Sequence, residues 1–475
     1  MRVILEHDGR DELLTEFEHY LGRSGGAFFE PGRAITAGRA PARIDCMGGI
    51  ADYSGSVVFE GPLREAAVVA FQERGDSALR ALSVSPAGAE RPREAEFDLR
   101  SFRDASGRTR AYAELCALFA RDESKAWSAN VLGAVAVLEN ESVHRFERGA
   151  NLLLWRALPL GAGVGSSAAM QVAAMFALTG GLGIQLPGLR LAALAQAVEN
   201  KVVGAPCGIM DQATSALGEA GKLLALRCQP CELLGQHELP EGVKVVGINS
   251  RVHHSVAGAA YATARVSAFM GLKAILTEKA KRGEPITEAD SYLCNIAPRD
   301  YVRQYRHLIP ERMAGADFLK EFGETTDPVT RVDASGAYRV RAGTDHPVFE
   351  HYRVRTFIEC MDRACAGDRT ALVEAGGLMY ASHWSYGWNC GLGCEETDLL
   401  VSLVRRRGPE QGLYGARVSG GGSGGTVAVL AEAGAADAIA EVAAEYETRT
   451  GRRPDVFDGT SPGAYAFGLR RYRLE

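Results

Sequence analysis

Three glycines and two serines gather in the segment L-P-L-G-A-G-V-G-S-S-A-A-M-Q-V, residues 158–172. Gly161, Gly163 and Gly165 allow the backbone to turn tightly and to expose its N–H groups. Ser166 and Ser167 stand where a helix would begin. Unpaired N–H groups and the helix dipole both favour an anion at such a place. The segment is therefore predicted to cradle a phosphate group.

Other interpretations of this glycine loop differ in the residues that they require. A P-loop needs a lysine after its last glycine, and none follows Gly165. A dinucleotide fingerprint, G-x-G-x-x-A, is matched by Gly163, Gly165 and Ala168, but it needs an acidic residue about 20 positions later. Residues 180–183 are glycine-rich there instead. A purely structural strand-to-helix turn and a phosphate loop of another superfamily both stay open.

Charged residues also occur in two segments that are otherwise apolar. The first, A-P-A-R-I-D-C-M-G-G-I-A-D-Y-S-G (residues 40–55), contains Arg43, Asp45 and Asp52. The second, G-A-P-C-G-I-M-D-Q (residues 204–212), contains Asp211. Charges in apolar surroundings need partners, so the first segment predicts a polar pocket and the second a paired or catalytic acid. The alternative for the first segment is a surface turn with solvated charges, and the alternative for Asp211 is a helix cap.

The elements that must position these residues alternate between strands and helices. Residues 151–158 are apolar and strand-like, and residues 168–178 are nearly all good helix formers. The glycine loop thus joins a strand to a helix. Residues 189–203 predict an amphipathic helix whose lone acidic residue is Glu199, and Trp127 opens another helix.

The rest of the chain predicts a mixture of strands and helices, interrupted by a polar, irregular stretch at 279–345. The glycine–serine run V-S-G-G-G-S-G-G-T-V-A-V-L (residues 418–430) leads directly into a strand, which favours a close backbone approach to another loop over a flexible linker. The remaining predicted strands are 57–62, 66–72, 223–226, 243–249 and 463–469, and the remaining predicted helices are 11–21, 258–276, 300–308, 314–322, 351–366, 371–385, 397–405 and 435–447.

Length and composition describe an ordinary globular protein. The chain has 475 residues, 46% hydrophobic and 24% charged, and a net charge of −6, so an extended nucleic-acid surface is not expected. No apolar run approaches the roughly 20 residues of a membrane span, and the N-terminus lacks a signal peptide's apolar segment. A cytoplasmic protein without a membrane partner is expected; nothing in the sequence indicates an oligomeric state.

Three separated motifs, in the same order, resemble the superfamily of galactokinase, homoserine kinase, mevalonate kinase and phosphomevalonate kinase, the GHMP kinases. A-P-A-R-I-D-C-M-G-G-I-A-D-Y (residues 40–53) is similar to the family's A-P-G-R-x-[ND]-x-x-G-E-H-x-D-Y. The other two motifs are the glycine loop and S-G-G-G-S-G-G-T-V. E-N-K-V-V-G-A-P-C-G-I-M-D-Q (residues 199–212) resembles the galactokinases specifically, and the likeness extends from about residue 38 to the end.

The resemblance implies an α+β, two-domain GHMP-kinase fold with the active site in the cleft between the domains. Residues 38–240 would form the ATP-binding N-terminal domain, a mixed sheet with helices like domain 2 of ribosomal protein S5. Residues 241–475 would form a ferredoxin-like α+β domain, and residues 1–37 an N-terminal extension.

The resemblance also implies roles for single residues. Asp211 would be the catalytic aspartate that faces the anomeric hydroxyl of a sugar, with Arg43 beside it. Mg²⁺ would be held by Ser167, or by Ser166 one position earlier, and by Glu199, since this ion prefers hard oxygen ligands. ATP, as co-substrate, would contact Gly161, Gly163, Val164, Gly165, Ser166, Ser167 and Trp127, and the sugar would contact Arg43, Gly49, Asp52, Gly208, Asp211 and Tyr261.

One departure from the galactokinase pattern bears on the substrate. Gly49 and Ile50 stand where galactokinases have Glu-His, and the glutamate is associated with the C6 hydroxyl of the sugar in that family. L-arabinose lacks that hydroxymethyl group, and the first and last motifs resemble the kinase region of plant L-arabinokinases more closely than galactokinases. An L-arabinose 1-kinase is expected. Galactose or a C6-modified sugar such as a uronic acid is the alternative, and a non-catalytic sugar sensor is an alternative of another class.

Overall fold

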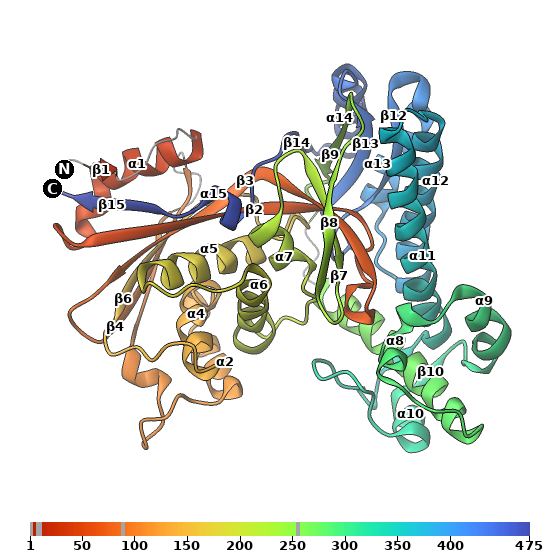
Figure 1. The fold of residues 1–475 in the computed structure, drawn as a ribbon, viewed down its shortest axis with the longest axis horizontal. Helices are drawn as coiled ribbons and strands as arrows, with labels where there is room; N and C mark the ends of the chain where they lie inside the picture. Colours follow the sequence, from red (N-terminus) through yellow and green to blue (C-terminus); the bar gives the residue numbers. More distant parts are fainter. Residues whose placement is uncertain (1–2, 6–11, 87–90, 253–256) are drawn as a thin grey trace.

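Two β-sheets and the helices that cover them make up the protein (Figure 1). The structure is a computed structural model that describes residues 3–5, 12–86, 91–252 and 257–475. Within these ranges, no helix combines the length and the apolar character needed to cross a membrane.

The larger sheet has nine strands and takes in both ends of the described chain. Its main path runs β1-β15-β2-β3-β6-β4-β5, and β7 and β8 extend it from the first part of β3. All neighbours are antiparallel except β4 and β6. The strands are β1 (Val3–Leu5), β2 (Ala34–Met47), β3 (Val57–Glu73), β4 (Ala78–Val84), β5 (Arg93–Asp98), β6 (Ala150–Ala157), β7 (Lys222–Arg227), β8 (Glu232–Glu238) and β15 (Arg470–Leu474).

The strand β3 corrects one prediction from the sequence. Two strands were expected at 57–62 and 66–72, but residues 57–73 form one strand that pairs with β2 along most of its length. Pro62, which has no N–H to donate, lies where the other neighbour of β3 changes from β7, at residues 57–60, to β6, at residues 66–73. The expected break is therefore a change of partner within a continuous strand.

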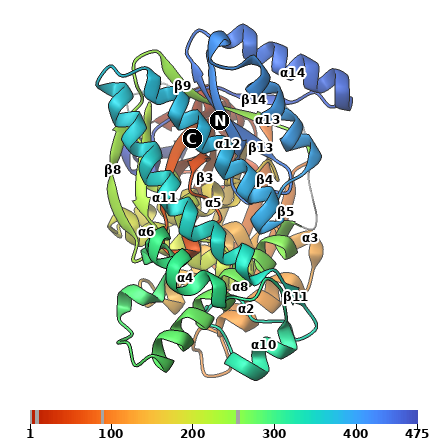
Figure 2. The same ribbon diagram turned by 90° about the vertical axis from the view of Figure 1, so that its right-hand side faces the viewer.

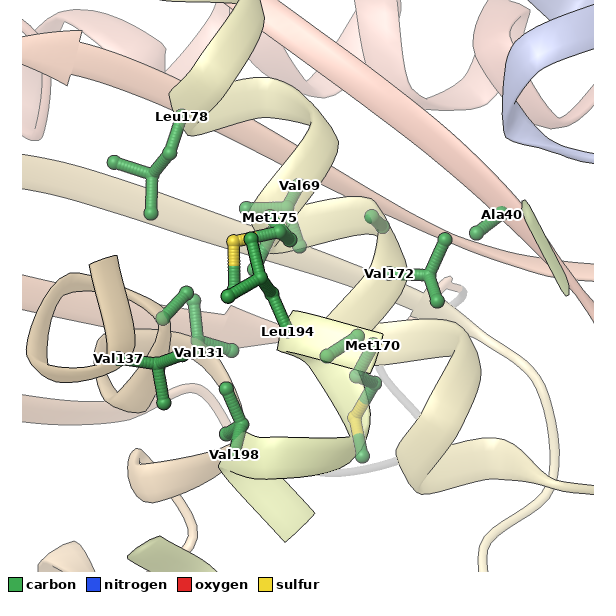
Figure 3. Close-up of a cluster of buried hydrophobic side chains, with 14 of the residues drawn as sticks. Ala40, Val69, Val131, Val137, Met170, Val172, Met175, Leu178, Leu194 and Val198 are labelled. Atoms are coloured by element: carbon green, nitrogen blue, oxygen red, sulfur yellow. The ribbon is translucent and has the colours of Figure 1, made fainter. Parts of the chain in front are cut away.

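Opposite faces of this sheet are covered by different helices, as Figure 1 shows. Side chains of β3 alternate between them, with Val69 facing one cluster and Val68 the other. The first cluster includes α4 (Ala129–Asn140), α5 (Ser166–Gly181), α6 (Gly188–Ala197) and α7 (Met210–Leu217), and the second includes α1 (Glu12–Ser24). Figure 3 shows the first cluster where Met175 of α5, Val131 of α4 and Leu194 of α6 meet.

The smaller sheet is antiparallel, in the order β12-β13-β9-β14. Its strands are β9 (Val243–Asn249), β12 (Leu413–Val418), β13 (Thr426–Glu432) and β14 (Asp455–Phe457). Val427 and Val429 of β13 pack with α13 (Glu395–Arg407) and α14 (Ala436–Thr450). Ala428 and Leu430 face a cluster that contains α11 (Val340–Cys365), α12 (Thr370–Ser385) and the end of β2. This cluster joins the two sheets.

The polar stretch at 279–345 contains more structure than its composition suggests. The long helix α8 (Ala257–Lys281) is followed by short elements that pack against α8 and α11 around Tyr301 and Phe318, at the bottom of Figure 2. These include α9 (Pro298–Asp300), a π-helical turn at Tyr301–Tyr305, α10 (Gly315–Phe322) and the hairpin of β10 (Met313–Ala314) and β11 (Ala337–Tyr338). The helix predicted at 314–322 is confirmed.

Two further predicted boundaries were wrong. The helix expected at 351–366 begins at Val340, because its polar first turns are buried against α8 despite Pro347 within them. The strand expected at 463–469 is displaced: Ala464–Phe467 form the short helix α15, and the strand β15 begins at Arg470, where the chain reaches the edge of β2. In both places tertiary contacts decide the element.

Candidate active site

The glycine loop lies between β6 and α5, as predicted, and forms one wall of a cavity of about 650 Å³. Gly163 and Gly165 have φ angles of 72° and 68°, in the left-handed region that favours glycine. A Cβ at Gly165 would lie 3.1 Å from Oδ2 of Asp211. The loop can therefore approach the acidic group closely only because its residues are small.

Most of the residues that the family resemblance singled out line this one cavity. They come from β2, the turn before α4, the glycine loop and the start of α5, the segment after α6, and the helices α7 and α8, so both halves of the chain contribute. The predicted residues on the lining are Arg43, Trp127, Gly161, Gly163, Val164, Gly165, Ser166, Ser167, Glu199, Asp211 and Tyr261. Gly49, Asp52 and Gly208 are not among the described residues that line it.

Arg43 and Asp211 form the central charge pair of the site. The Nε and Nη2 groups of Arg43 each donate to a carboxylate oxygen of Asp211 at 2.8 Å, and its Nη1 donates to the carbonyl of Gly163 at 2.8 Å. Burial opposes the charge on Arg43, but the carboxyls of Asp211, Glu60 and Asp45 raise its pKa above the ordinary value. Arg43 thus fixes the acid against the glycine loop.

A second buried pair stands behind the first. Arg417 of β12 lies 2.7 Å from Oδ1 of Asp45, and both side chains have no exposed surface. The backbone N–H groups of Gly49 and Gly420 also donate to Asp45, each at 3.3 Å. The resemblance assigned no role to Asp45, although an acid in an apolar strand had indicated a partner.

Glu199 and Ser167 offer oxygen ligands beside the glycine loop. Glu199 lies on a π-helical turn (Val198–Val203) that continues α6, where burial raises its pKa to about 7 although Gln171 donates a hydrogen bond to it. The hydroxyl of Ser166 donates to the carbonyl of Pro159. The hydroxyl of Ser167 has no partner among the residues that the structure describes. A carboxylate and a free hydroxyl in one cavity fit the hard ligands that Mg²⁺ prefers.

Two of the predicted sugar contacts, Gly208 and Asp52, pack against each other, and a third, Gly49, packs against Asp45 and Tyr386. A Cβ on Gly208 would lie 1.6 Å from Oδ2 of Asp52, so this carboxyl rests directly against the backbone. Burial, and then the charge of Asp211, raise the pKa of Asp52 to about 6. A Cβ on Gly49 would lie 2.1 Å from Oδ2 of Asp45 and 2.5 Å from the hydroxyl of Tyr386. Only glycine fits at both positions.

The late glycine run meets the first glycine loop, which confirms the predicted close approach. A Cβ on Gly420 would lie 2.6 Å from the carbonyl oxygen of Gly163, and one on Gly425 would lie 2.8 Å from that of Ala162. The hydroxyl of Thr426 donates to the same Ala162 carbonyl at 2.7 Å. The two glycine runs therefore pack backbone to backbone, across the junction of the two sheets.

Several cavity residues were not found from the sequence. Arg156, at the end of β6, and Arg93, on β5, bring two more cations to the lining, and the Arg93 guanidinium lies 5.5 Å from the ring centre of Trp127. Cys207 and Gln212 flank Asp211 on the lining. Arg156 could have been identified from the sequence, because an arginine within an apolar strand needs a polar or charged partner. Arg93 lies in a polar segment, where nothing distinguishes it from other surface arginines.

Comparisons with known proteins show the family to which this chain belongs. Residues 129–219 match the GHMP kinases N terminal domain, and residues 368–448 match the GHMP kinases C terminal domain. An L-arabinokinase of Arabidopsis thaliana is 39% identical over 502 residues, which cover 95% of this chain and 48% of the plant protein. The chain thus spans about half the length of that relative.

Two bacterial proteins match over nearly the whole chain. A galactokinase of Chloroflexus aggregans is 30% identical over 93% of each chain. The crystal structure of Lactococcus lactis galactokinase complexed with galactose has the same fold, with a TM-score of 0.70, 19% identity, and coverage of 95% of this chain and 99% of that one. With both domain models matched in order as well, the chain belongs to the GHMP kinase family and, within it, to the sugar kinases.

Proposed function

We propose that this chain transfers the γ-phosphoryl group of ATP to the anomeric hydroxyl of a monosaccharide. The observation that carries the proposal is the pairing of Arg43 with Asp211 on the wall that the glycine loop also lines. Two hydrogen bonds of 2.8 Å hold this carboxylate in one orientation. Asp211 therefore offers a fixed acceptor for a sugar hydroxyl beside a phosphate cradle.

The division of roles follows from the chemistry of phosphoryl transfer. Its transition state is loose, so that positioning and charge neutralisation contribute more than strong base catalysis. Asp211 would orient the hydroxyl and accept its proton late, while Arg43 keeps the acid in place. The exposed N–H groups of the loop from Gly161 to Ser167 would bind the ATP phosphates, and Trp127 would contact the adenine.

Mg²⁺ is the cofactor that the site would take. Ser167 and Glu199 would hold it, and when bound it neutralises charge on the ATP phosphates. Ser167 is favoured over Ser166 because the Ser166 hydroxyl already donates to Pro159. The raised pKa of Glu199 fits a buried carboxyl that a cation would convert to its ionised form.

L-arabinose is the proposed sugar, and Gly49 supports it. Asp45 and Tyr386 fill the space that a side chain at position 49 would need. The glutamate that galactokinases carry there, and that is associated with the C6 hydroxyl in that family, has no counterpart in this chain. A pyranose that lacks the hydroxymethyl group, with galactose's arrangement at C2, C3 and C4, suits such a site. The name of the plant relative agrees.

A coupled assay of ADP release with a panel of aldoses tests the proposal. We expect L-arabinose to have the highest kcat/KM, by roughly tenfold or more over galactose, because a single extra methylene group already changes kcat/KM by roughly 10- to 200-fold and galactose adds a whole hydroxymethyl group. If galactose or galacturonate has a higher kcat/KM than L-arabinose, that sugar is the preferred substrate and the arabinose proposal is wrong. Sugar binding by calorimetry without ADP release from any aldose would instead indicate a sensor.

A further inference from the structure

Glu60 is a buried carboxyl that the mechanism above does not use. It lies on β3, directly opposite Asp45 in the register of β2 and β3, and has no exposed surface. Neither of its oxygens accepts a hydrogen bond from any residue that the structure describes. Nε of Arg43 lies 3.5 Å from Oε2 of Glu60, but this N–H donates to Asp211 at 2.8 Å. An ionised carboxylate left in this position would be costly.

A count of charges around Glu60 shows which carboxyl is in excess. The cluster contains two arginines, Arg43 and Arg417, and three carboxyls. Asp211 is paired with Arg43, and Asp45 is paired with Arg417 and accepts two backbone N–H groups. Two cations thus balance two anions and leave Glu60 without a counterion of its own. Burial, and then the charge of Asp45, raise the pKa of Glu60 well above its ordinary value, although Arg43 opposes this.

We propose that Glu60 is a positioning residue that stays protonated at neutral pH and donates to Asp45, and that its ionisation limits activity at alkaline pH. This inference rests on the proposed kinase function. An ionised Glu60 would compete with Asp211 for the guanidinium of Arg43 and would place a third negative charge near the acceptor site. Asp211 would then lose the fixed orientation that phosphoryl transfer needs.

Each element packed against Glu60 contributes to its surroundings. Burial raises the thiol pKa values of Cys46 and Cys228, so both stay neutral and add no charge. The titratable and charged groups that face Glu60 are Arg43, Asp45 and Cys46 of β2, Cys228 after β7, Asp211 of α7 and, through Asp45, Arg417 of β12.

The pH dependence of activity separates this role from a merely structural one. Glu60→Gln keeps the shape and the donor of the protonated acid but cannot ionise. We expect its kcat/KM at neutral pH to stay within about twofold of the wild type, and its alkaline decline to move up by about one pH unit or more. Glu60→Met, an apolar replacement of similar size, cannot ionise either. Its alkaline decline should move up in the same way, and it serves if the glutamine variant does not fold.

Glu65→Gln is the matched control. Glu65 lies on the same strand, has a buried oxygen without a hydrogen-bond partner among the described residues and a pKa raised by burial, but the side-chain charges that act on it are those of Arg64 and Asp458, not those of Arg43, Asp45 and Asp211. Its pH–rate profile should coincide with that of the wild type. A loss of tenfold or more in kcat/KM for Glu60→Gln at neutral pH, or an unchanged alkaline decline in both Glu60 variants, overturns the proposal.

Infrared difference spectroscopy tests the protonation state without turnover. At neutral pH the wild type should show the carbonyl stretch of a protonated carboxyl that is missing from Glu60→Gln and present in Glu65→Gln. The band should disappear as the pH is raised through the alkaline decline. Its absence at neutral pH would overturn the proposal even if the enzyme phosphorylates arabinose. Conversely, a chain that releases no ADP with any aldose refutes the proposed function, while the band still decides whether Glu60 is protonated.

Discussion

The guanidinium of Arg43 holds the carboxylate of Asp211 through two hydrogen bonds of 2.8 Å, although the two residues are 168 positions apart in the sequence. The same guanidinium donates to the carbonyl of Gly163. One side chain therefore connects β2, the glycine loop and the first turn of α7. The position of the acid relative to the phosphate cradle depends on this connection.

Replacing Asp211 by Asn should lower kcat by roughly 10² to 10⁴, the range for a positioned acid–base group, because an amide does not accept the proton of the sugar hydroxyl. The side chain keeps its size, so calorimetric binding of the sugar should change little. Asp437→Asn in α14 makes the same change at an exposed position and should keep full activity. Undiminished turnover in Asp211→Asn would exclude the proposed role.

Removing Arg417 should destabilise the fold strongly. Arg417→Met leaves the fully buried Asp45 without its cation, and breaking one partner of such a pair costs about 3–5 kcal/mol. Asp45→Asn added to Arg417→Met should recover most of that loss. Urea unfolding measures each value. Arg227→Gln, which breaks the exposed pair with Glu232, is the control and should cost at most about 1 kcal/mol. Equal costs for the two single variants would contradict the expectation.

Alanine substitutions of the two serines in the glycine loop should change different properties of the protein. Ser167→Ala should raise the Mg²⁺ concentration needed for half-maximal activity, because Ser167 lines the cavity and its hydroxyl has no hydrogen-bond partner among the described residues. Ser166→Ala should act mainly on stability, by about 1 kcal/mol, since it removes a hydrogen bond to Pro159. Activity titrated with Mg²⁺ and thermal unfolding distinguish the two. A larger Mg²⁺ effect in Ser166→Ala would reverse the assignment of the metal ligand.

Gly49→Ala should destabilise the protein by about 1–3 kcal/mol, because its methyl group would meet Asp45 and Tyr386 in a closely packed interior. Gly377 on α12 is the matched control: a Cβ there meets no atom within 4 Å. Gly377→Ala should stabilise the helix by about 0.5–1 kcal/mol. Chemical denaturation of both variants tests the contrast, and a Gly49→Ala protein of normal stability would show that Asp45 or Tyr386 can move aside.

Asp52 should make the stability of the unliganded protein depend on pH. Its pKa is raised from 3.8 to about 6, so the folded state binds this proton more tightly than the unfolded chain does. The stabilisation is complete below about pH 4 and is lost as the pH rises towards about 6, with a total of roughly 2–3 kcal/mol. Asp52→Asn should remove this part of the pH dependence. Parallel pH profiles for the two proteins, from urea unfolding, would argue against a raised pKa.

Local structure around the glycine loop followed from the residues themselves. The apolar run before Gly161 and the helix formers after Ser167 became β6 and α5, since strand and helix propensities act over a few residues. The buried polar helix start at Val340 and the strand at Arg470 were not predictable in this way. Their conformations are fixed by packing against α8 and by pairing with β2, which involve residues far away in the sequence.

By itself, the sequence determined the α+β class, the family motifs and the residues that could carry chemistry, because these depend on residue type and short spacing. Only the tertiary structure decided that Arg43 pairs with Asp211 and that Arg417 pairs with Asp45. It also decided that Gly49 packs against Asp45 and Tyr386 and is not among the described residues that line the cavity. The physical reason is that a charge in an apolar segment requires a partner, while the identity of that partner depends on which strands and loops the folded chain brings together.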